Sequence, residues 1–220
     1  MKYRTIFSNF YGNINTNIDD SNDLSECFYP MVIDGVEIET DGFEGLSIEN
    51  PEQYPENKLA QFDYDIKYPY KDKEKKLLVL KNYQLNAFIP IQVLEKESGK
   101  RMKVDMKITM SHDGNNFKRI CSLLGNSSEN SDMEVAFREL QTQLKNDYSM
   151  EICSNCKNSS WHPYGGNEFF NHLCFEKESI AFQFIENKTK TSVGGFMKYG
   201  NNKNWELVQL TDYCDKFEAQ

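Results

Sequence analysis

At residues 31–39 the chain reads Met31-Val32-Ile33-Asp34-Gly35-Val36-Glu37-Ile38-Glu39. Two runs rich in β-branched residues flank an Asp-Gly pair, and this pair readily adopts the positive φ angles of a type I′ turn. The stretch therefore predicts a β-hairpin. It is the strongest local signal in the chain, and we expect antiparallel hairpins of this kind to build most of the fold.

A second hairpin is predicted further along. Residues 87–94 and 101–110 flank the turn-like sequence Glu97-Ser98-Gly99-Lys100. Pro90 within the first arm predicts an edge position or a bulge, because proline cannot donate a hydrogen bond to a neighbouring strand. In the second arm, apolar residues alternate so that they share one face, which we interpret as core rather than a binding groove; they are Met102, Val104, Met106, Ile108 and Met110.

Further strands are predicted at residues 3–7, 59–68 and 117–124, and the polar residues 8–26 are expected to form a loop. One amphipathic helix is predicted near residues 132–146. Ser131 followed by Glu134 matches a capping box at its start. The apolar residues of this segment follow helical spacing; they are Met133, Ala136, Phe137, Leu140 and Leu144.

These elements predict an α+β protein that is mostly β. We expect a β-sandwich-like N-terminal part, one amphipathic helix, and a smaller Cys-bearing β part at the C-terminus. The polar segment 126–131 interrupts the pattern and is taken as the boundary between two parts, 1–125 and 126–220. A chain of 220 residues is long enough for one large domain or two small ones.

The net charge of −9 narrows the class of partner. Nucleic-acid phosphates and anionic membrane surfaces both require a basic face, so neither is expected, whereas a basic protein is compatible. The N-terminus lacks the apolar region of a signal peptide, and no apolar run approaches the ~20 residues of a membrane span. We therefore expect a cytoplasmic protein, in which the six cysteines are thiols or metal ligands rather than disulfides.

The motif Cys153-Ser154-Asn155-Cys156 is the main candidate for chemistry. Two residues between cysteines allow a tight turn to direct both sulfurs at one ion. A tetrahedral site needs two more ligands, and Cys174 and Cys214 are the candidates, with His162 and His172 as substitutes. The hypothesis is a structural zinc site formed by Cys153, Cys156, Cys174 and Cys214, and its alternative is a set of buried thiols that pack as small hydrophobic groups.

Two kinds of thiol chemistry are weaker alternatives. A redox-active Cys-x-x-Cys normally opens a helix, and the Pro- and Gly-containing sequence after Cys156 does not favour one. A hydrolase or thiol enzyme would use Cys174 with His162 or His172, or a zinc-bound water. No residue that would orient the histidine is identifiable, so the catalytic residues stay unassigned and a non-enzymatic role is favoured.

Acidic residues are densest between positions 34 and 65, where Lys58 is the only basic residue. Such a surface could bind a basic protein such as a toxin, and the alternative is an ordinary solvated surface. Some acidic bacterial proteins of this size are immunity proteins, which makes an immunity-type inhibitor the working hypothesis. The acidic residues are Asp34, Glu37, Glu39, Asp41, Glu44, Glu49, Glu52, Glu56, Asp63 and Asp65.

The C-terminal third contains three spaced motifs, which are Cys153-x-x-Cys156-x-x-Ser159-x-x-x-Pro163-Tyr164-Gly165, Leu173-Cys174-Phe175 and Thr211-x-Tyr213-Cys214-x-x-Phe217. Together these motifs resemble those of a family of uncharacterised bacterial proteins. The last motif departs slightly, because Tyr213 directly precedes Cys214 where the family pattern has one residue between them. The family has no assigned activity, so the resemblance implies that the four cysteines belong together and implies no reaction.

Overall fold

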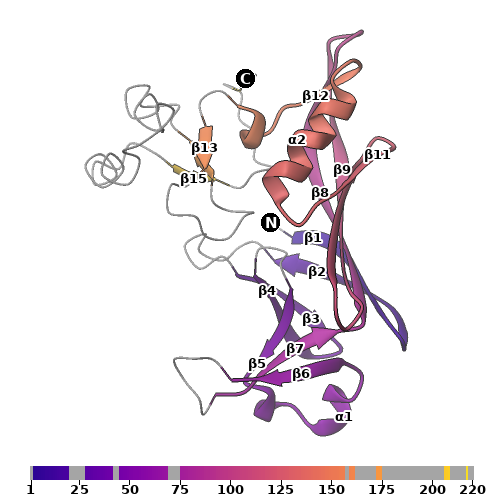
Figure 1. Ribbon diagram of the computed structural model, residues 1–220, viewed down its shortest axis with the longest axis vertical. Helices are drawn as coiled ribbons and strands as arrows, with labels where there is room; N and C mark the ends of the chain where they lie inside the picture. Colours follow the sequence, from indigo (N-terminus) through magenta and orange to yellow (C-terminus); the bar gives the residue numbers. More distant parts are fainter. Residues whose placement is uncertain are drawn as a thin grey trace, which may run out of the picture. The chain divides into compact units, whose positions relative to one another are not determined.

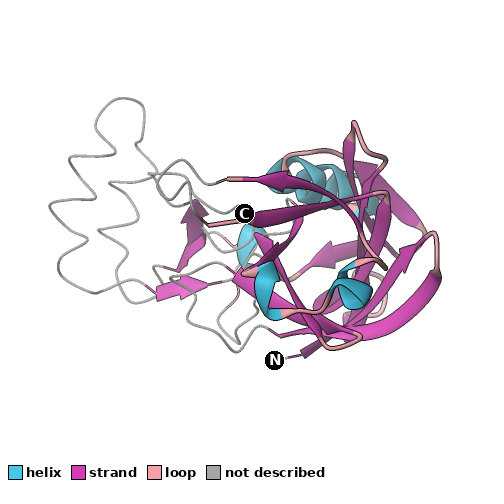
Figure 2. Ribbon diagram, turned by 90° about the horizontal axis from the view of Figure 1, so that it is seen from below, coloured by secondary structure: helices cyan, strands magenta, loops and turns pink. Residues whose placement is uncertain are grey.

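The computed structural model describes residues 2–19, 28–41, 45–68, 75–156, 159–161, 172–174, 206–208 and 217. Strands dominate these residues, the strand pairs among them are antiparallel, and one longer helix is present (Figures 1 and 2). The prediction of an α+β, mostly β protein is confirmed. Among the described residues, no helix has the length and apolar character needed to cross a membrane.

The chain divides into two compact units, each assembled from two stretches. The first contains residues 1–89 and 106–131, and the second contains residues 90–105 and 132–220. Two long strands, β8 (Tyr83–Glu95) and β9 (Lys100–His112), contribute to both units. The boundary predicted at 125–126 stays a prediction.

A five-stranded antiparallel sheet belongs to the first unit, with the strand order β3-β4-β5-β7-β6. On β3, β4, β5 and β7, alternate residues are buried, because successive side chains of a strand point to opposite faces of the sheet. The bounds are Phe28–Ile33 for β3, Val36–Asp41 for β4, Leu46–Glu49 for β5, Asp63–Lys67 for β6 and Leu77–Lys81 for β7.

The hairpin predicted at residues 31–39 is formed by β3 and β4. Ile33 pairs with Val36 at its closed end, and the turn residues Asp34 and Gly35 have φ angles of 49° and 82°. These positive angles explain why Asp-Gly stands here, since both residues tolerate the left-handed region.

The segment predicted as a strand over residues 59–68 is shorter than expected. Its first residue, Leu59, ends helix α1 (Glu56–Leu59), which follows the short 3₁₀ helix η1 (Pro51–Gln53), and residues 60–62 form a turn. Only Asp63–Lys67 forms the strand β6. Alternation does not mark the start of this strand, because the turn that follows α1 continues to Phe62, whose N–H donates to the Leu59 carbonyl at 3.0 Å.

A larger antiparallel sheet has the order β11-β10-β9-β8-β1-β2. Its short outer strand β12 (Tyr148–Met150) pairs with β8, where Tyr148 lies opposite Glu95. The hairpin predicted around Glu97-Ser98-Gly99-Lys100 is confirmed by β8 and β9. The remaining strands are β1 (Lys2–Asn9), β2 (Gly12–Asp19), β10 (Phe117–Leu123) and β11 (Asn126–Glu129).

The loop predicted for residues 8–26 is wrong over its first part, because Gly12–Asp19 forms strand β2. This strand pairs with β1 along its whole length, from Lys2 opposite Asp19 to Asn9 opposite Gly12. Ile18 is fully buried. Cross-strand pairing and the burial of one apolar side chain therefore outweigh the low strand propensity of the asparagines.

Pro90 occupies a place in β8 that suits its missing N–H group. On one side of β8, the pairing with β1 covers residues 84–88 and the pairing with β12 covers residues 93–95. Pro90 lies between these two pairings, where neither β1 nor β12 pairs with it. On this side, Pro90 has no partner in β1 or β12, as a residue at the edge of a sheet would have none, although β8 as a whole lies inside the sheet.

The predicted helix is α2 (Met133–Leu144). All five residues assigned to its apolar face are at most 2% exposed. Its N-cap is Asp132, whose carboxylate accepts a hydrogen bond from the Val135 N–H at 3.1 Å, and not the predicted Ser131. Asp132 suits this position as well as serine does, because its side-chain oxygen satisfies an N–H group in the first turn.

After β12 the second unit continues through the 3₁₀ turn η2 (Cys153–Asn155). Three short strands then form an antiparallel sheet of order β13-β14-β15. Ser159 lies opposite Cys174, and Cys174 lies opposite Glu206. The strands are β13 (Ser159–Trp161), β14 (His172–Cys174) and β15 (Glu206–Val208).

Candidate functional site

The Cys-x-x-Cys motif forms a closed turn in the second unit. The Asn155 N–H donates to the Ile152 carbonyl at 2.9 Å, and the Cys156 N–H donates to the Cys153 carbonyl at 3.1 Å. Cys153 and Cys156 are only 7% and 4% exposed. The motif thus places two buried sulfurs on one tight turn, as a metal knuckle requires.

The third predicted ligand lies on a strand beside this turn. Turn η2 contacts both β13 and β14, and β14 ends at Cys174. The backbone of His172 lies on the same strand, whereas Cys214 and His162 fall outside the described residues. Among residues whose side chains the structure describes, no group of three or more His, Cys, Asp or Glu residues is arranged to hold a metal. The structure therefore brings together Cys153, Cys156 and the strand of Cys174, and the four-cysteine site stays a prediction.

The side chain of Asn155, between the two cysteines, ties the turn to helix α2. Its Nδ2 donates to Gln141 Oε1 at 3.0 Å and to the Met150 carbonyl at 3.1 Å. Gln141 Oε1 also accepts the Met150 N–H at 2.8 Å. One carboxamide oxygen thus joins the helix, the end of β12 and the Cys-x-x-Cys turn.

An ion pair between a buried carboxylate and a partly exposed arginine fixes the segment that leads into the turn. The Glu151 side chain is 3% exposed, and its Oε2 lies 2.8 Å from Nε of Arg101 on β9. The Glu151 N–H donates to the Gln92 carbonyl of β8 at 2.9 Å. A carboxylate is rarely buried unless it is paired, so Arg101 and Glu151 anchor the start of the turn to the long hairpin.

Sequence reasoning missed all four of these supporting residues. Gln141 and Asn155 are 14 positions apart, and Arg101 and Glu151 are 50 positions apart. No local pattern connects residues at such separations. A polar residue inside the motif, Asn155, was the only signal that a side-chain contact of this kind could exist.

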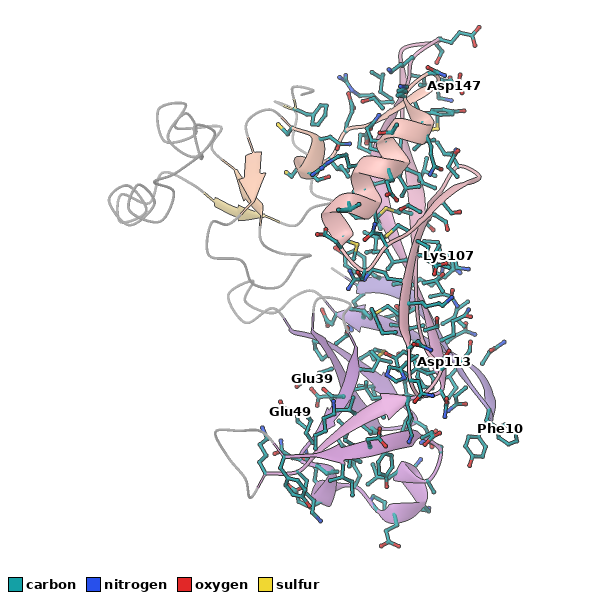
Figure 3. The ribbon with its side chains drawn as sticks, in the orientation of Figure 1. Phe10, Glu39, Glu49, Lys107, Asp113 and Asp147 are labelled. Atoms are coloured by element: carbon teal, nitrogen blue, oxygen red, sulfur yellow. The ribbon has the colours of Figure 1, made fainter. Side chains whose placement is uncertain are left out.

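The acidic block lies partly on one face of the five-stranded sheet in the first unit. Glu37 and Glu39 alternate with the buried residues Val36, Ile38 and Thr40 on β4, so both carboxylates project from the outer face. Glu39 pairs with Ser47 on β5 and Ser47 with Val79 on β7, which pairs with Asp65 on β6. Figure 3 labels Glu39 and Glu49 on this sheet.

Lysines from outside the acidic block neutralise part of this face. Lys75 lies 2.5 Å from Glu49, and Lys81 lies 2.8 Å from Asp65 and 3.8 Å from Asp63. Elsewhere in the block, Lys58 lies 2.6 Å from Asp34. The sequence of residues 34–65, in which Lys58 is the only basic residue, therefore overstates the net negative charge of the folded surface.

The electrostatics single out Glu39 within this face. Partial burial, followed by the negative charges of Glu49 and Glu37, raises the pKa of Glu39, and Lys75 acts in the opposite direction. These carboxylates are therefore close enough to repel one another. We name Glu37, Glu39 and Glu49 the acidic face.

The first unit also has an open cleft of about 350 Å³ where three turns meet. Several of its polar groups already bind neighbouring protein groups: His112 Nδ1 accepts the Gly114 N–H at 3.0 Å, and Asn9 Nδ2 donates to the Gln61 carbonyl at 2.8 Å. Asp113, labelled in Figure 3, accepts the N–H groups of Asn115 and Asn116. These contacts stabilise the turns and do not form a nucleophile–base pair.

Comparison of the chain with protein-family models, with curated proteins and with solved structures gave no match.

Proposed function

We propose that this chain is a non-enzymatic binding protein, in which a structural zinc site holds the C-terminal part together and the acidic face binds a basic protein. The immunity-type inhibitor is the specific form of this proposal, and the cytoplasm is the proposed location, since thiols stay reduced there. The main structural support for the zinc site is the closed turn that presents two buried cysteines beside the strand of Cys174.

Support for the metal comes from the chemistry of this turn. A zinc ion bound by four thiolates is tetrahedral, with Zn–S bonds of roughly 2.3 Å, so all four sulfurs would lie within about 4 Å of one another. A turn of two buried cysteines supplies half of this set, and a neighbouring strand end can supply a third. Cys214 is proposed as the fourth ligand on the basis of the sequence.

One further detail of the turn fits a bound group. The hydroxyl of Ser154 is buried and has no hydrogen-bond partner among the residues that the structure describes. A buried hydroxyl without a partner costs about 1–3 kcal/mol. A metal-bound thiolate would be a suitable acceptor for it.

Elemental analysis of protein purified without added metal tests the zinc site. We expect stoichiometric zinc, lost on Cys153→Ser and Cys156→Ser and retained on Cys121→Ala. Cys121 is the matched control because it is also buried but lies on β10, outside the turn. Folded protein without zinc would refute the site.

The acidic face is tested by charge reversal. A variant with Glu37→Lys and Glu39→Lys is expected to lose a basic partner recovered by the wild-type protein, and the wild-type complex should weaken with salt. Glu97→Lys is the control, since Glu97 is exposed on the turn between β8 and β9. Binding that is unchanged by the double reversal would contradict a role for this face.

The alternative, a hydrolase or thiol enzyme using Cys174 or a zinc-bound water, gains no support from a described residue. The structure describes the backbone of Cys174 as part of β14 and does not describe its side chain. The open cleft is lined by residues of the first unit, whereas Cys174 belongs to the second. We therefore propose no reaction.

A further inference from the structure

We infer that Gln141 and Asn155 are positioning residues that hold the Cys153–Cys156 turn in its metal-binding conformation before any metal arrives. This inference rests on the proposed metal site and assigns it a support that lies outside the cysteines. Three hydrogen bonds meet at the side chains of these two residues.

The Cys153–Asn155 turn has little stability of its own. Its two backbone hydrogen bonds, from Asn155 to Ile152 and from Cys156 to Cys153, define the 3₁₀ conformation. Short 3₁₀ turns have poor hydrogen-bond geometry and are only weakly stable alone. A side chain within the turn that reaches a rigid neighbour can therefore decide whether the conformation persists.

Asn155 is such a side chain, and helix α2 is the rigid neighbour. The Nδ2 group of Asn155 donates to Gln141 Oε1 and to the Met150 carbonyl at 3.0 and 3.1 Å. Gln141 is on a helix whose residues Phe137 and Leu140 are at most 1% exposed, so the acceptor is attached to a packed element. The turn is thus fixed in its middle by α2 and at its start by the Arg101–Glu151 pair.

The consequence is a lower cost of metal binding. A pair of ligands that is already fixed loses less conformational freedom when it binds an ion. Groups that orient metal ligands from outside the coordination sphere typically change metal affinity by roughly 10- to 100-fold. Removing the Asn155–Gln141 hydrogen bond should therefore weaken zinc binding without removing any sulfur.

The test is a competition titration of Zn²⁺ against a chromophoric chelator, using the full chain stripped of metal under reducing conditions. Asn155→Ala and Gln141→Met are each expected to weaken zinc binding by roughly 10- to 100-fold. Gln141→Glu keeps an acceptor oxygen at the same place and should bind zinc almost as well as the wild type. Gln143→Met is the matched control, because it makes the same change at an exposed position of the same helix.

Far-UV circular dichroism of the metal-free proteins separates positioning from folding. If Gln141→Met does not fold, Asn155→Ala decides, because it leaves the Gln141–Met150 hydrogen bond in place. Wild-type affinity in Asn155→Ala would overturn the positioning role while leaving the zinc site intact. Wild-type protein that takes up no zinc would refute the zinc site and this inference with it.

Discussion

Replacing Arg101 by Met is predicted to destabilise the second unit by about 2 kcal/mol. The substitution leaves the Glu151 carboxylate, whose side chain is 3% exposed, without the guanidinium that lies 2.8 Å away. A hydrogen bond to a charged group contributes about 1.5–3 kcal/mol, and breaking a fully buried pair costs about 3–5 kcal/mol. The Arg101 side chain is 58% exposed, so in the variant water can partly replace the lost guanidinium as a partner of Glu151. The range of about 1.5–3 kcal/mol therefore applies.

The assay is urea denaturation followed by circular dichroism. With a urea m-value of about 2 kcal/mol/M, the loss should lower the midpoint by about 1 M. Lys103→Met is the control, because Lys103 is an exposed cation on the same strand. The double variant Arg101→Met/Glu151→Leu should regain most of the lost stability, since it removes the buried charge together with its partner.

Two results would refute this reasoning. One is an Arg101→Met midpoint equal to that of Lys103→Met, which would mean that the pair contributes nothing measurable. The other is a double variant no more stable than Arg101→Met, which would mean that the buried carboxylate is not the source of the loss.

Three further predictions concern the rest of the described chain. Leu140→Ala, at a fully buried position of α2, should cost about 2–5 kcal/mol in the same assay, and a loss below about 1 kcal/mol would contradict close packing of this helix. Gly35→Ala, at φ 82°, should cost about 1 kcal/mol. Gly45→Ala should have little effect, because Gly45 has no positive φ and, like Gly35, no atom within 4 Å of its added Cβ; equal losses would argue against the turn geometry. Burial raises the pKa of the Cys121 thiol from 9.0 to about 12, so above pH 9 the unfolded chain loses this proton while the folded chain keeps it. The midpoint of thermal unfolding should therefore fall from pH 9 to pH 11, less steeply in Cys121→Ala, and identical slopes would contradict the burial effect.

Much of the fold could be predicted because its signals are local. The Asp34-Gly35 turn and the apolar face of α2 each depend on residues within a few positions of one another, and both are confirmed. Strand β2 was missed because its pairing with β1 and the burial of Ile18 decide its structure. Neither is visible in an Asn-rich segment read alone.

In the candidate site, too, only the structure set by neighbouring residues could be predicted from the sequence. The Cys153–Cys156 spacing predicts a tight turn, and the structure contains one. The contacts that hold the turn come from Gln141, Arg101 and the long hairpin, which meet it only after the chain has folded. Ion pairing on the outer face of the first unit was missed for the same reason, because Lys75 and Lys81 enter from outside the acidic block.

The most direct test of the account is the zinc content of reduced, folded protein purified without added metal, measured by elemental analysis together with protein concentration. We expect one zinc ion per chain, with four sulfur neighbours at about 2.3 Å in the zinc X-ray absorption spectrum. Folded protein that contains no zinc, or zinc without a shell of four sulfurs, would contradict it.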